Sequence, residues 1–287
     1  MSAFPHIEPF FHAQTGTWTY VVHDGAVAVI IDPVLDYDHK SGAVSTESIQ
    51  QVRDYIDAQG LKLERILETH AHADHLTAAD VIKRDSHVPV GIGEGIRKVQ
   101  AHFAPIFGLD PAAAELAQAF EETYVDGQRI TTGSMAFDVL ATPGHTSDSL
   151  SYRIGDNVFV GDTLFAPDVG TARCDFPGGS IEALHASIQR FYAMPDDTRL
   201  WLCHDYPTQG REPRTHVTVR ESKRDNIMLS ANDTEEEFAR KRSQRDASLA
   251  APNLLYPSLQ VNIRGGSLPE KSPNGQRYML TPIKGTL

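Results

Sequence analysis

Three histidines and one aspartate within six positions constrain this chain more than any other feature. A short apolar strand expected at Arg65–Glu68 runs directly into His70, His72, Asp74 and His75. Side chains two positions apart in an extended segment point the same way, so His70, His72 and Asp74 can project together. Helix capping does not require three histidines. The run therefore predicts a metal site with nitrogen and oxygen ligands, suited to zinc, iron or manganese.

Three later strand ends each carry one further residue of the same kind. His145, Asp162 and His204 each follow a short β-branched or apolar run. Any one of them alone would be an ordinary hydrogen-bonding group in a loop. Together they complete ligand sets for two metals: His70, His72 and His145 for one, and Asp74, His75 and His204 for the other, with Asp162 between them.

Composition removes several classes of protein. The 287 residues contain 26 Lys and Arg against 38 Asp and Glu, a formal net charge of −12. This argues against nucleic acid as a partner, because such proteins need a basic face. We expect no membrane partner either, since no apolar run approaches 18 residues. The start of the chain lacks a signal-peptide pattern, so we expect a cytoplasmic location. Two cysteines, Cys174 and Cys203, do not make a disulfide framework and are expected to pack in the core.

Periodicity predicts strands and helices in alternation. A hairpin is expected at Trp18–Val22 and Val27–Ile31. Helices are expected at Thr46–Gln59, Leu76–Arg84, Gly95–Phe103 and, after the cap Ser180, Ile181–Phe191. Beyond about residue 207 the composition changes. We expect the charged segment Arg220–Arg245 to be helical, and we expect coil from there to the end.

The order His-x-His-x-Asp-His, then a distant His, an Asp and a His, resembles the metallo-β-lactamase superfamily. The resemblance covers roughly residues 15–207. It implies an α/β fold, an αββα sandwich with its metal site along one edge. The implied division is a catalytic core over residues 1–207 and a helical and coil extension over residues 208–287 that covers the active-site edge.

Within that superfamily the chain looks most similar to the persulfide dioxygenases. The motifs that carry this resemblance are Thr69–Thr77, Thr142–Thr146, Gly161–Phe165, Gly170–Phe176 and Cys203–Tyr206. The resemblance implies one Fe(II) per chain, held by His70, His145 and Asp162, and oxidation of glutathione persulfide with O2 to sulfite and glutathione. His72, Asp74, His75 and His204 would then orient the metal ligands by hydrogen bonds. A homodimer is common among such proteins.

The chain also resembles the glyoxalase II type of hydrolase in all seven ligand positions. That alternative implies two zinc ions and a bridging water that attacks the thioester of a hydroxyacylglutathione. Spacing alone does not separate the two enzymes. A metal-bearing scaffold without catalysis is a third possibility, but every ligand position is filled.

Both enzymes need local positive charge to bind an anionic, glutathione-like substrate. Arg173 and Tyr206 lie inside the motifs of the resemblance, and Arg214 lies in the basic segment Arg211–Arg224. We therefore expect substrate contacts from Arg173, Tyr206 and Arg214, although such a basic run is equally typical of a solvated helical face. No catalytic residue beyond the metal centre is expected.

Overall fold

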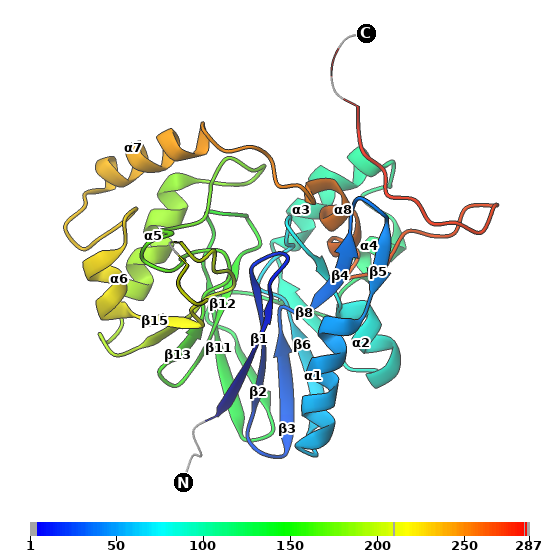
Figure 1. Cartoon of the computed structure of the whole chain (residues 1–287), viewed down its shortest axis with the longest axis horizontal. Coiled ribbons are helices and arrows are strands. Elements are labelled where there is room, and N and C mark those ends of the chain that lie inside the picture. The colour runs from blue at the N-terminus through cyan, green and yellow to red at the C-terminus, as the bar shows by residue number, and fades with distance from the viewer. Residues whose placement is uncertain (1–4, 209, 284, 286–287) are drawn as a thin grey trace.

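The computed structural model of the protein describes residues 5–208, 210–283 and 285. Two six-stranded sheets form the centre of the molecule, and helices lie on the outer side of each (Figure 1). The expected αββα sandwich is confirmed.

The first sheet has the strand order β1-β2-β3-β6-β8-β9, and its last four strands are parallel. Its strands are β1 (His6–His12), β2 (Thr17–His23), β3 (Val27–Ile31), β6 (Lys62–Leu67), β8 (Val90–Gly93) and β9 (Glu122–Tyr124). The helices of this half are α1 (Glu47–Ala58), α2 (Ala79–Ser86), α3 (Ile96–Phe103), the 3-10 helix η1 (Ala104–Phe107) and α4 (Ala114–Ala117). A small sheet, β5-β4-β7, comprises β4 (Val34–Asp38), β5 (Ala43–Ser45) and β7 (Leu76–Thr77).

The second sheet has the order β10-β11-β12-β13-β14-β15, with only β13 and β14 parallel. Its strands are β10 (Arg129–Thr132), β11 (Met135–Ala141), β12 (Leu150–Ile154), β13 (Asn157–Phe159), β14 (Arg199–Trp201) and β15 (His216–Thr218). Helices α5 (Ile181–Tyr192), α6 (Val219–Asp225) and α7 (Glu235–Asp246) lie on this side of the molecule (Figure 1).

Side chains of the first sheet alternate between two apolar clusters. On β2, Val21 joins the cluster shared with α1, α2 and α3, whereas Tyr20 and Val22 face the second sheet. On β3, Ile30 takes the helix side and Ile31 the inter-sheet side. Because both faces are covered, these strands read as nearly continuous apolar runs. A third cluster lies between the second sheet and α5, α6 and α7.

The prediction of a helix at Leu76–Arg84 is wrong for its first residues. Leu76 and Thr77 form β7 and pair with β4, so α2 begins only at Ala79. The amide of Thr77 donates to Asn262 Oδ1 over 2.9 Å instead of entering a helix. The segment after His75 is therefore extended, and it is held by a residue near the end of the chain.

The coil expected after Arg245 is also wrong, because α8 (Leu255–Asn262) forms there. Its Pro257 reads as a helix breaker, but it lies in the first helical turn, where the backbone N–H has no helical partner to lose. Leu259 and Val261 are buried in the same apolar cluster as α1, α2 and α3. Among the described residues, no helix has the length and hydropathy needed to cross a bilayer.

Candidate metal centre

The expected metal ligands lie at the carboxyl ends of four strands. Strand β6 leads into residues 70–75, β11 into His145, β13 into Asp162 and β14 into His204. Strands β11, β13 and β14 run in the same direction, since β12 reverses the chain between β11 and β13. Their ends meet at one edge of the sandwich, where the structure gathers all seven expected ligands into overlapping groups.

A glycine allows the loop that carries His145 to sit directly on α5. Gly144 has φ +141°, and a Cβ at this position would lie 2.3 Å from the backbone nitrogen of Leu184. The carbonyl of Gly144 also accepts a 2.9 Å hydrogen bond from the backbone of Ser180, the residue that caps α5. A larger residue would push His145 away from the other ligands.

The first group of ligands consists of His70, His145 and Asp162. Their ligand atoms lie within 4.8 Å of one another, and all three side chains are buried. Asp162 Oδ2 lies 3.8 Å from Nε2 of His70 and 3.8 Å from Nε2 of His145. Two imidazole nitrogens and one carboxylate oxygen directed at a common point match the ligand set of non-haem iron centres.

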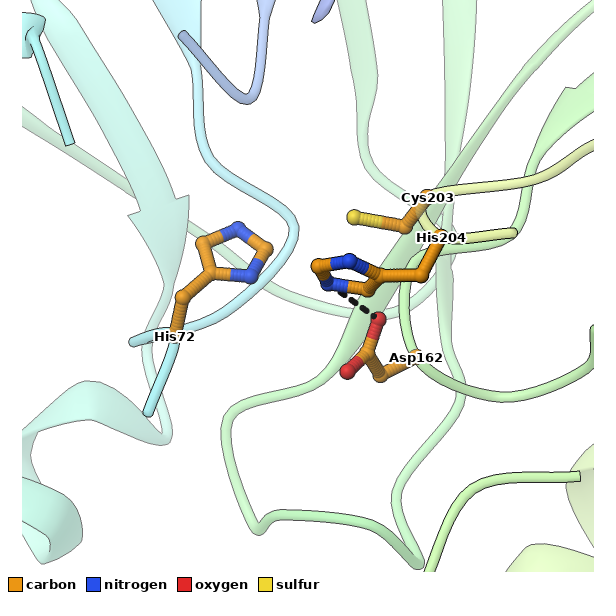
Figure 2. Close-up of side chains that lie close together, drawn as sticks. All are labelled: His72, Asp162, Cys203 and His204. Atoms are coloured by element: carbon orange, nitrogen blue, oxygen red, sulfur yellow. Dashed lines mark ion pairs between the residues drawn. The ribbon is translucent and has the colours of Figure 1, made fainter. Parts of the chain in front are cut away.

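The second group consists of His72, Asp74, His75 and His204, again with ligand atoms within 4.8 Å of one another. His204 Nε2 lies 3.4 Å from Asp74 Oδ2 and 3.3 Å from Asp162 Oδ1; the latter pair is drawn in Figure 2. The two oxygens of Asp162 therefore face different groups. The residues could hold one cation in the first group, or two cations that share Asp162.

Three of the histidines are oriented by a contact on Nδ1, which directs Nε2 into the site. The partners are Thr69 Oγ1 at 3.1 Å for His70, the Arg173 carbonyl at 2.8 Å for His145 and Thr17 Oγ1 at 3.2 Å for His204.

In His72 the orienting contact is made by Nε2 and not by Nδ1, and its partner is Asp32, which directly follows β3. The distance from His72 Nε2 to Asp32 Oδ1 is 3.0 Å, and Asp32 also accepts hydrogen bonds from the amide and hydroxyl of Thr69 at 2.7 and 2.9 Å. Burial raises the pKa of Asp32, although the Thr69 bonds oppose this. Asp32 was not among the residues expected at the site, although it shares the signal of the expected metal ligands, a polar residue directly after a buried strand.

Five buried ligand atoms have no hydrogen-bond partner among the described residues. They are His70 Nε2, His72 Nδ1, His75 Nε2, Asp162 Oδ1 and His204 Nε2. Buried polar atoms are rarely left without partners in folded proteins. All five are able to coordinate a cation, so the residues present fit a bound metal.

The electrostatics of the site agree with this. Burial, together with neighbouring histidines, lowers the pKa of His70 and of His72 well below the ordinary value. Each imidazole is therefore neutral and has one nitrogen whose lone pair is available to a metal. Burial also acts to lower the pKa of His204, but the charges of Asp162 and Asp74 outweigh it and raise that pKa. The two carboxylates thus attract positive charge to the point where His204 Nε2 lies.

Asn262, from α8, ties the metal-binding loop to the C-terminal part of the chain. Its Nδ2 donates to the carbonyls of His72 and His75, both over 2.8 Å, and its Oδ1 accepts from the amide of Thr77. Asn262 is buried, and all its partners flank the second ligand group. Asn262 was not expected at the site from the sequence, since no local pattern connects residues so far apart in the chain.

A pocket of about 510 Å³ opens beside the metal centre and is lined by Asp74, His145 and Asp162. Arg173 and Tyr206 line it as well. The Tyr206 hydroxyl donates to Asp74 Oδ2 over 3.3 Å.

The Arg173 guanidinium already has partners. It makes two 2.6 Å hydrogen bonds to the carboxylate of Asp175 and a 2.7 Å bond to the carbonyl of Ala250. It also lies over the ring of Phe176, whose edge approaches His145. Arg173 therefore stiffens the pocket wall beside His145.

A different arginine presents a guanidinium that is unpaired among the described residues to the pocket. Arg245, at the end of α7, lines the pocket and is exposed, and its guanidinium has no hydrogen bond or ion pair with any described residue. Arg214 is exposed but does not line this pocket, and its amide donates to Asp205 Oδ2. The structure thus does not bring Arg214 to the other expected substrate residues, and it places at the pocket Arg245, which was not expected there from the sequence.

Comparison with known proteins agrees with this geometry. Residues 13–204 match the family model of the metallo-beta-lactamase superfamily, and the chain belongs to that superfamily. Among solved structures it is similar to ETHE1 from Myxococcus xanthus, with a TM-score of 0.73 and 29% identity over 91% of this chain and 100% of that one.

Curated proteins are similar to this chain over nearly its whole length. The chain is 45% identical to the beta-lactamase hydrolase-like protein of Agrobacterium fabrum, over 98% of its own length but only 65% of that protein. It is 40% identical to Glyoxylase B2 of Dictyostelium discoideum, over 99% of this chain and 96% of that protein. It is 26% identical to the persulfide dioxygenase ETHE1 of Mus musculus, over 91% of this chain and 88% of that protein.

Proposed function

We propose that this protein is a persulfide dioxygenase that uses one Fe(II) per chain to oxidise glutathione persulfide with O2. The observation that carries the proposal is the buried trio of His70, His145 and Asp162, with Asp162 Oδ2 3.8 Å from each imidazole Nε2. Two histidines and one carboxylate on one face of an octahedron leave three positions open, as in non-haem iron oxygenases. Similarity to a persulfide dioxygenase supports the same function.

The reaction converts one persulfide, one O2 and one water to one thiol, one sulfite and two protons. When bound, Fe(II) supplies the electron-transfer chemistry that allows O2 to react with the persulfide sulfur. The chain fixes the ligand geometry: Thr69 orients His70, and the carbonyl of Arg173 orients His145. No side chain needs to bond covalently to the substrate, so we assign no catalytic residue beyond the metal centre.

The pocket suits a thiol that carries a carboxylate at a distance from its sulfur. Asp162 and His145 line it on the side of the metal centre, and Phe165 and Leu254 add apolar surface. The guanidinium of Arg245 is unpaired among the described residues, and a substrate carboxylate can accept two parallel hydrogen bonds from such a group. Glutathione persulfide has these features, so we assign it as the substrate.

A second function, hydrolysis of a glutathione thioester with two zinc ions, is favoured by a different observation. Asp162 Oδ1 faces His204 Nε2 at 3.3 Å, and His75 Nε2 is buried without a hydrogen-bond partner among residues 5–208, 210–283 and 285. Both atoms would be ligands of a second cation. The similarity to Glyoxylase B2 supports this alternative.

Metal content and substrate turnover together test the proposal. The full chain, purified without added zinc, is expected to contain one iron per chain and to consume O2 when glutathione persulfide is added. The same preparation is tested for hydrolysis of S-lactoylglutathione, before and after the metal is exchanged for zinc. Two zinc ions per chain with rapid thioester hydrolysis, and no persulfide-dependent O2 consumption by the iron form, would overturn the dioxygenase and establish the hydrolase.

A further inference from the structure

A chain of polar contacts leads from the wall of the pocket to the small sheet, and the reaction proposed above gives it no role. It lies at the turn between β1, which ends at His12, and β2, which begins at Thr17. Thr15, within that turn, lines the pocket beside the metal centre. Its Oγ1 lies 2.7 Å from Nδ1 of His12, and Nε2 of His12 lies 3.3 Å from Oδ1 of Asp36 on β4.

We propose that Thr15, His12 and Asp36 form a relay that carries protons released by the reaction in the pocket to the solvent. The relay rests on the proposed function, because oxidation of a persulfide to sulfite and a thiol releases protons. None of the three residues belongs to a candidate ligand group, so the relay is not part of the metal centre.

The turn that carries Thr15 is fixed against the segment that follows β14. Gly16 has φ +67°, and a Cβ at this position would lie 2.9 Å from the carbonyl oxygen of Asp205 and 2.9 Å from the ring of Tyr206. The amide of Asp205 donates to the carbonyl of Gly16 over 2.9 Å, and the amide of Gly16 donates to the carbonyl of His12 over 2.9 Å. The hydroxyl of Thr15 is therefore held at the pocket wall, within reach of His12.

The direction of the hydrogen bonds follows from the inner end of the chain. Thr17 Oγ1 lies 3.2 Å from Nδ1 of His204 and 2.7 Å from Oγ1 of Thr15. Because Nε2 of His204 faces the other candidate ligands, Nδ1 carries a proton and donates to Thr17. Each hydroxyl has one proton to donate. Thr17 therefore donates to Thr15, and Thr15 donates to Nδ1 of His12.

The outer end of the chain gives the same direction. An ionised carboxylate only accepts hydrogen bonds, so Nε2 of His12 carries the proton that faces Asp36, and Nδ1 keeps the lone pair. The amide and hydroxyl of Ser48, on α1, donate to Asp36 over 2.9 and 2.5 Å and hold the carboxylate in place. The side chain of Asp36 is 19% exposed, whereas His12 is buried. A proton that reaches Asp36 can therefore pass to water.

The charges around His12 suit a group that takes up a proton and releases it again. Burial lowers the pKa of His12 below its ordinary value; the charge of Asp36, from β4, opposes this shift, and that of His75, from the metal-binding loop, adds to it. The ring is thus neutral at neutral pH and can accept a proton on Nδ1. Asp36 stabilises the imidazolium that forms.

Each proton transfer is balanced and needs no oxidant or reductant. Thr15 Oγ1 takes a proton from the pocket while its own O–H bond breaks and an N–H bond forms at Nδ1 of His12. The Nε2 proton of the imidazolium then passes to Asp36 and from there to water. Exchange with water restores the form of His12 that carries its proton on Nε2.

Variants of His12 and Thr15 separate proton transfer from support of the turn. His12→Gln keeps a polar side chain but cannot take up a proton, so kcat for persulfide-dependent O2 consumption should fall roughly 100-fold, the lower end of the effect of a positioned proton-transfer group. Thr15→Val should lose activity in the same way, and Thr15→Ser should retain it. In His12→Ala, added imidazole should restore part of kcat, because it supplies the missing proton acceptor.

His23→Gln is the matched control. His23 is also buried, on β2, but its Nε2 lies 2.9 Å from the hydroxyl of Tyr55 and it does not line the pocket. This variant should keep the native kcat, and all variants should keep the native iron content. A native kcat in His12→Gln, a loss in His12→Ala that imidazole does not restore, or a loss of kcat that follows a loss of iron overturns the relay.

Nitrogen NMR of the metal-free chain decides the question if the variants do not fold or if the native chain consumes no O2. The ring shifts of His12 should place the proton on Nε2, and Asp36→Asn should lower the pKa of His12 further. A proton on Nδ1, or an unchanged pKa in Asp36→Asn, overturns the relay. A native chain without dioxygenase activity that passes both NMR tests overturns the proposed reaction alone, because hydrolysis of a thioester in this pocket also releases a proton.

Discussion

Asn262 is the residue whose replacement tests most directly how the C-terminal segment supports the metal centre. Its side chain makes three hydrogen bonds to the backbone of the metal-binding loop, at 2.8 Å to His72, 2.8 Å to His75 and 2.9 Å to Thr77. The first two residues belong to the second ligand group, and the third begins the segment that leads to α2. We predict that Asn262→Ala weakens both folding and metal binding.

The expected size follows from the groups left without partners. Asn262→Ala leaves two carbonyls and one amide in a buried region, and each such group costs about 1–3 kcal/mol when it stays unsatisfied. Water that enters the space vacated by the side chain recovers part of this. We therefore expect the free energy of unfolding to fall by roughly 2–4 kcal/mol. Metal affinity should fall by roughly 10–100-fold, the usual effect of removing a group that orients a ligand.

Two measurements and one control variant decide the matter. Urea unfolding of the metal-free chain gives the stability loss, and competition with a chelator gives the metal affinity. Gln260 lies on the same helix and is also buried, but its two side-chain hydrogen bonds, at 3.2 and 3.1 Å, go to the backbone of Leu280 and not to the metal loop. Gln260→Ala should reduce stability and leave metal affinity intact. Equal metal affinity in Asn262→Ala and Gln260→Ala would refute the role of Asn262.

Three further predictions concern other parts of the molecule. Asp32→Asn replaces one of two acceptors, either Oδ1, which contacts His72 and the Thr69 amide, or Oδ2, which accepts from the Thr69 hydroxyl. Because the orientation of His72 is disturbed, metal affinity should fall about 10–100-fold in the chelator competition, and unchanged affinity would contradict the orienting role of Asp32. Arg245→Ala should raise KM for glutathione persulfide by roughly 10–100-fold, because a charged hydrogen bond is lost, whereas Arg214→Ala should leave KM unchanged. Steady-state O2 consumption measures both KM values, and a larger increase in Arg214→Ala would show that Arg214 is the substrate residue. Hydrogen bonds from Arg211 and Thr208 lower the pKa of Asp168 from its ordinary 3.8 to about 2, although burial opposes this shift. The ionised carboxylate therefore stabilises the fold above about pH 4, and this contribution is lost as pH falls toward 2. Urea midpoints of the metal-free native chain and Asp168→Asn should therefore differ at about pH 5 and converge near pH 2, and a gap that does not change with pH would show that Asp168 is not stabilised by ionisation.

The clustering of the candidate metal ligands could be predicted from sequence because each of them follows a strand. His145, Asp162 and His204 are isolated in the sequence, yet each ends a recognisable β-run, and parallel or alternating strands bring those ends to one edge. The same rule applies to Asp32, which directly follows β3 but was not among the residues expected at the site.

The contributions of the C-terminal segment could not be predicted in the same way. Asn262 and Arg245 act on residues that lie far earlier in the chain, and neither belongs to a local motif. A basic run predicts positive charge but does not tell which side chains remain unpaired. Arg211 illustrates this, because its guanidinium is paired with Asp168 and Asp205, whereas that of Arg245 has no partner in the part of the chain that the structure describes.

The hydrogen bonds of Asp74 give a reason to expect that the seven candidate ligands bind one cation more readily than two. Asp74 Oδ1 lies 3.2 Å from His75 Nδ1, and Oδ2 accepts from the Tyr206 hydroxyl over 3.3 Å. A second cation coordinated by Asp74 must displace part of this network, at roughly 1–2 kcal/mol for a typical hydrogen bond. In the trio, by contrast, His70 Nε2 has no hydrogen bond with any described residue to lose, and Asp162 Oδ2 already lies equally far from both imidazole Nε2 atoms. We therefore expect the trio to fill first, and the second group to fill only with an ion whose affinity for its ligands exceeds the cost of freeing Asp74.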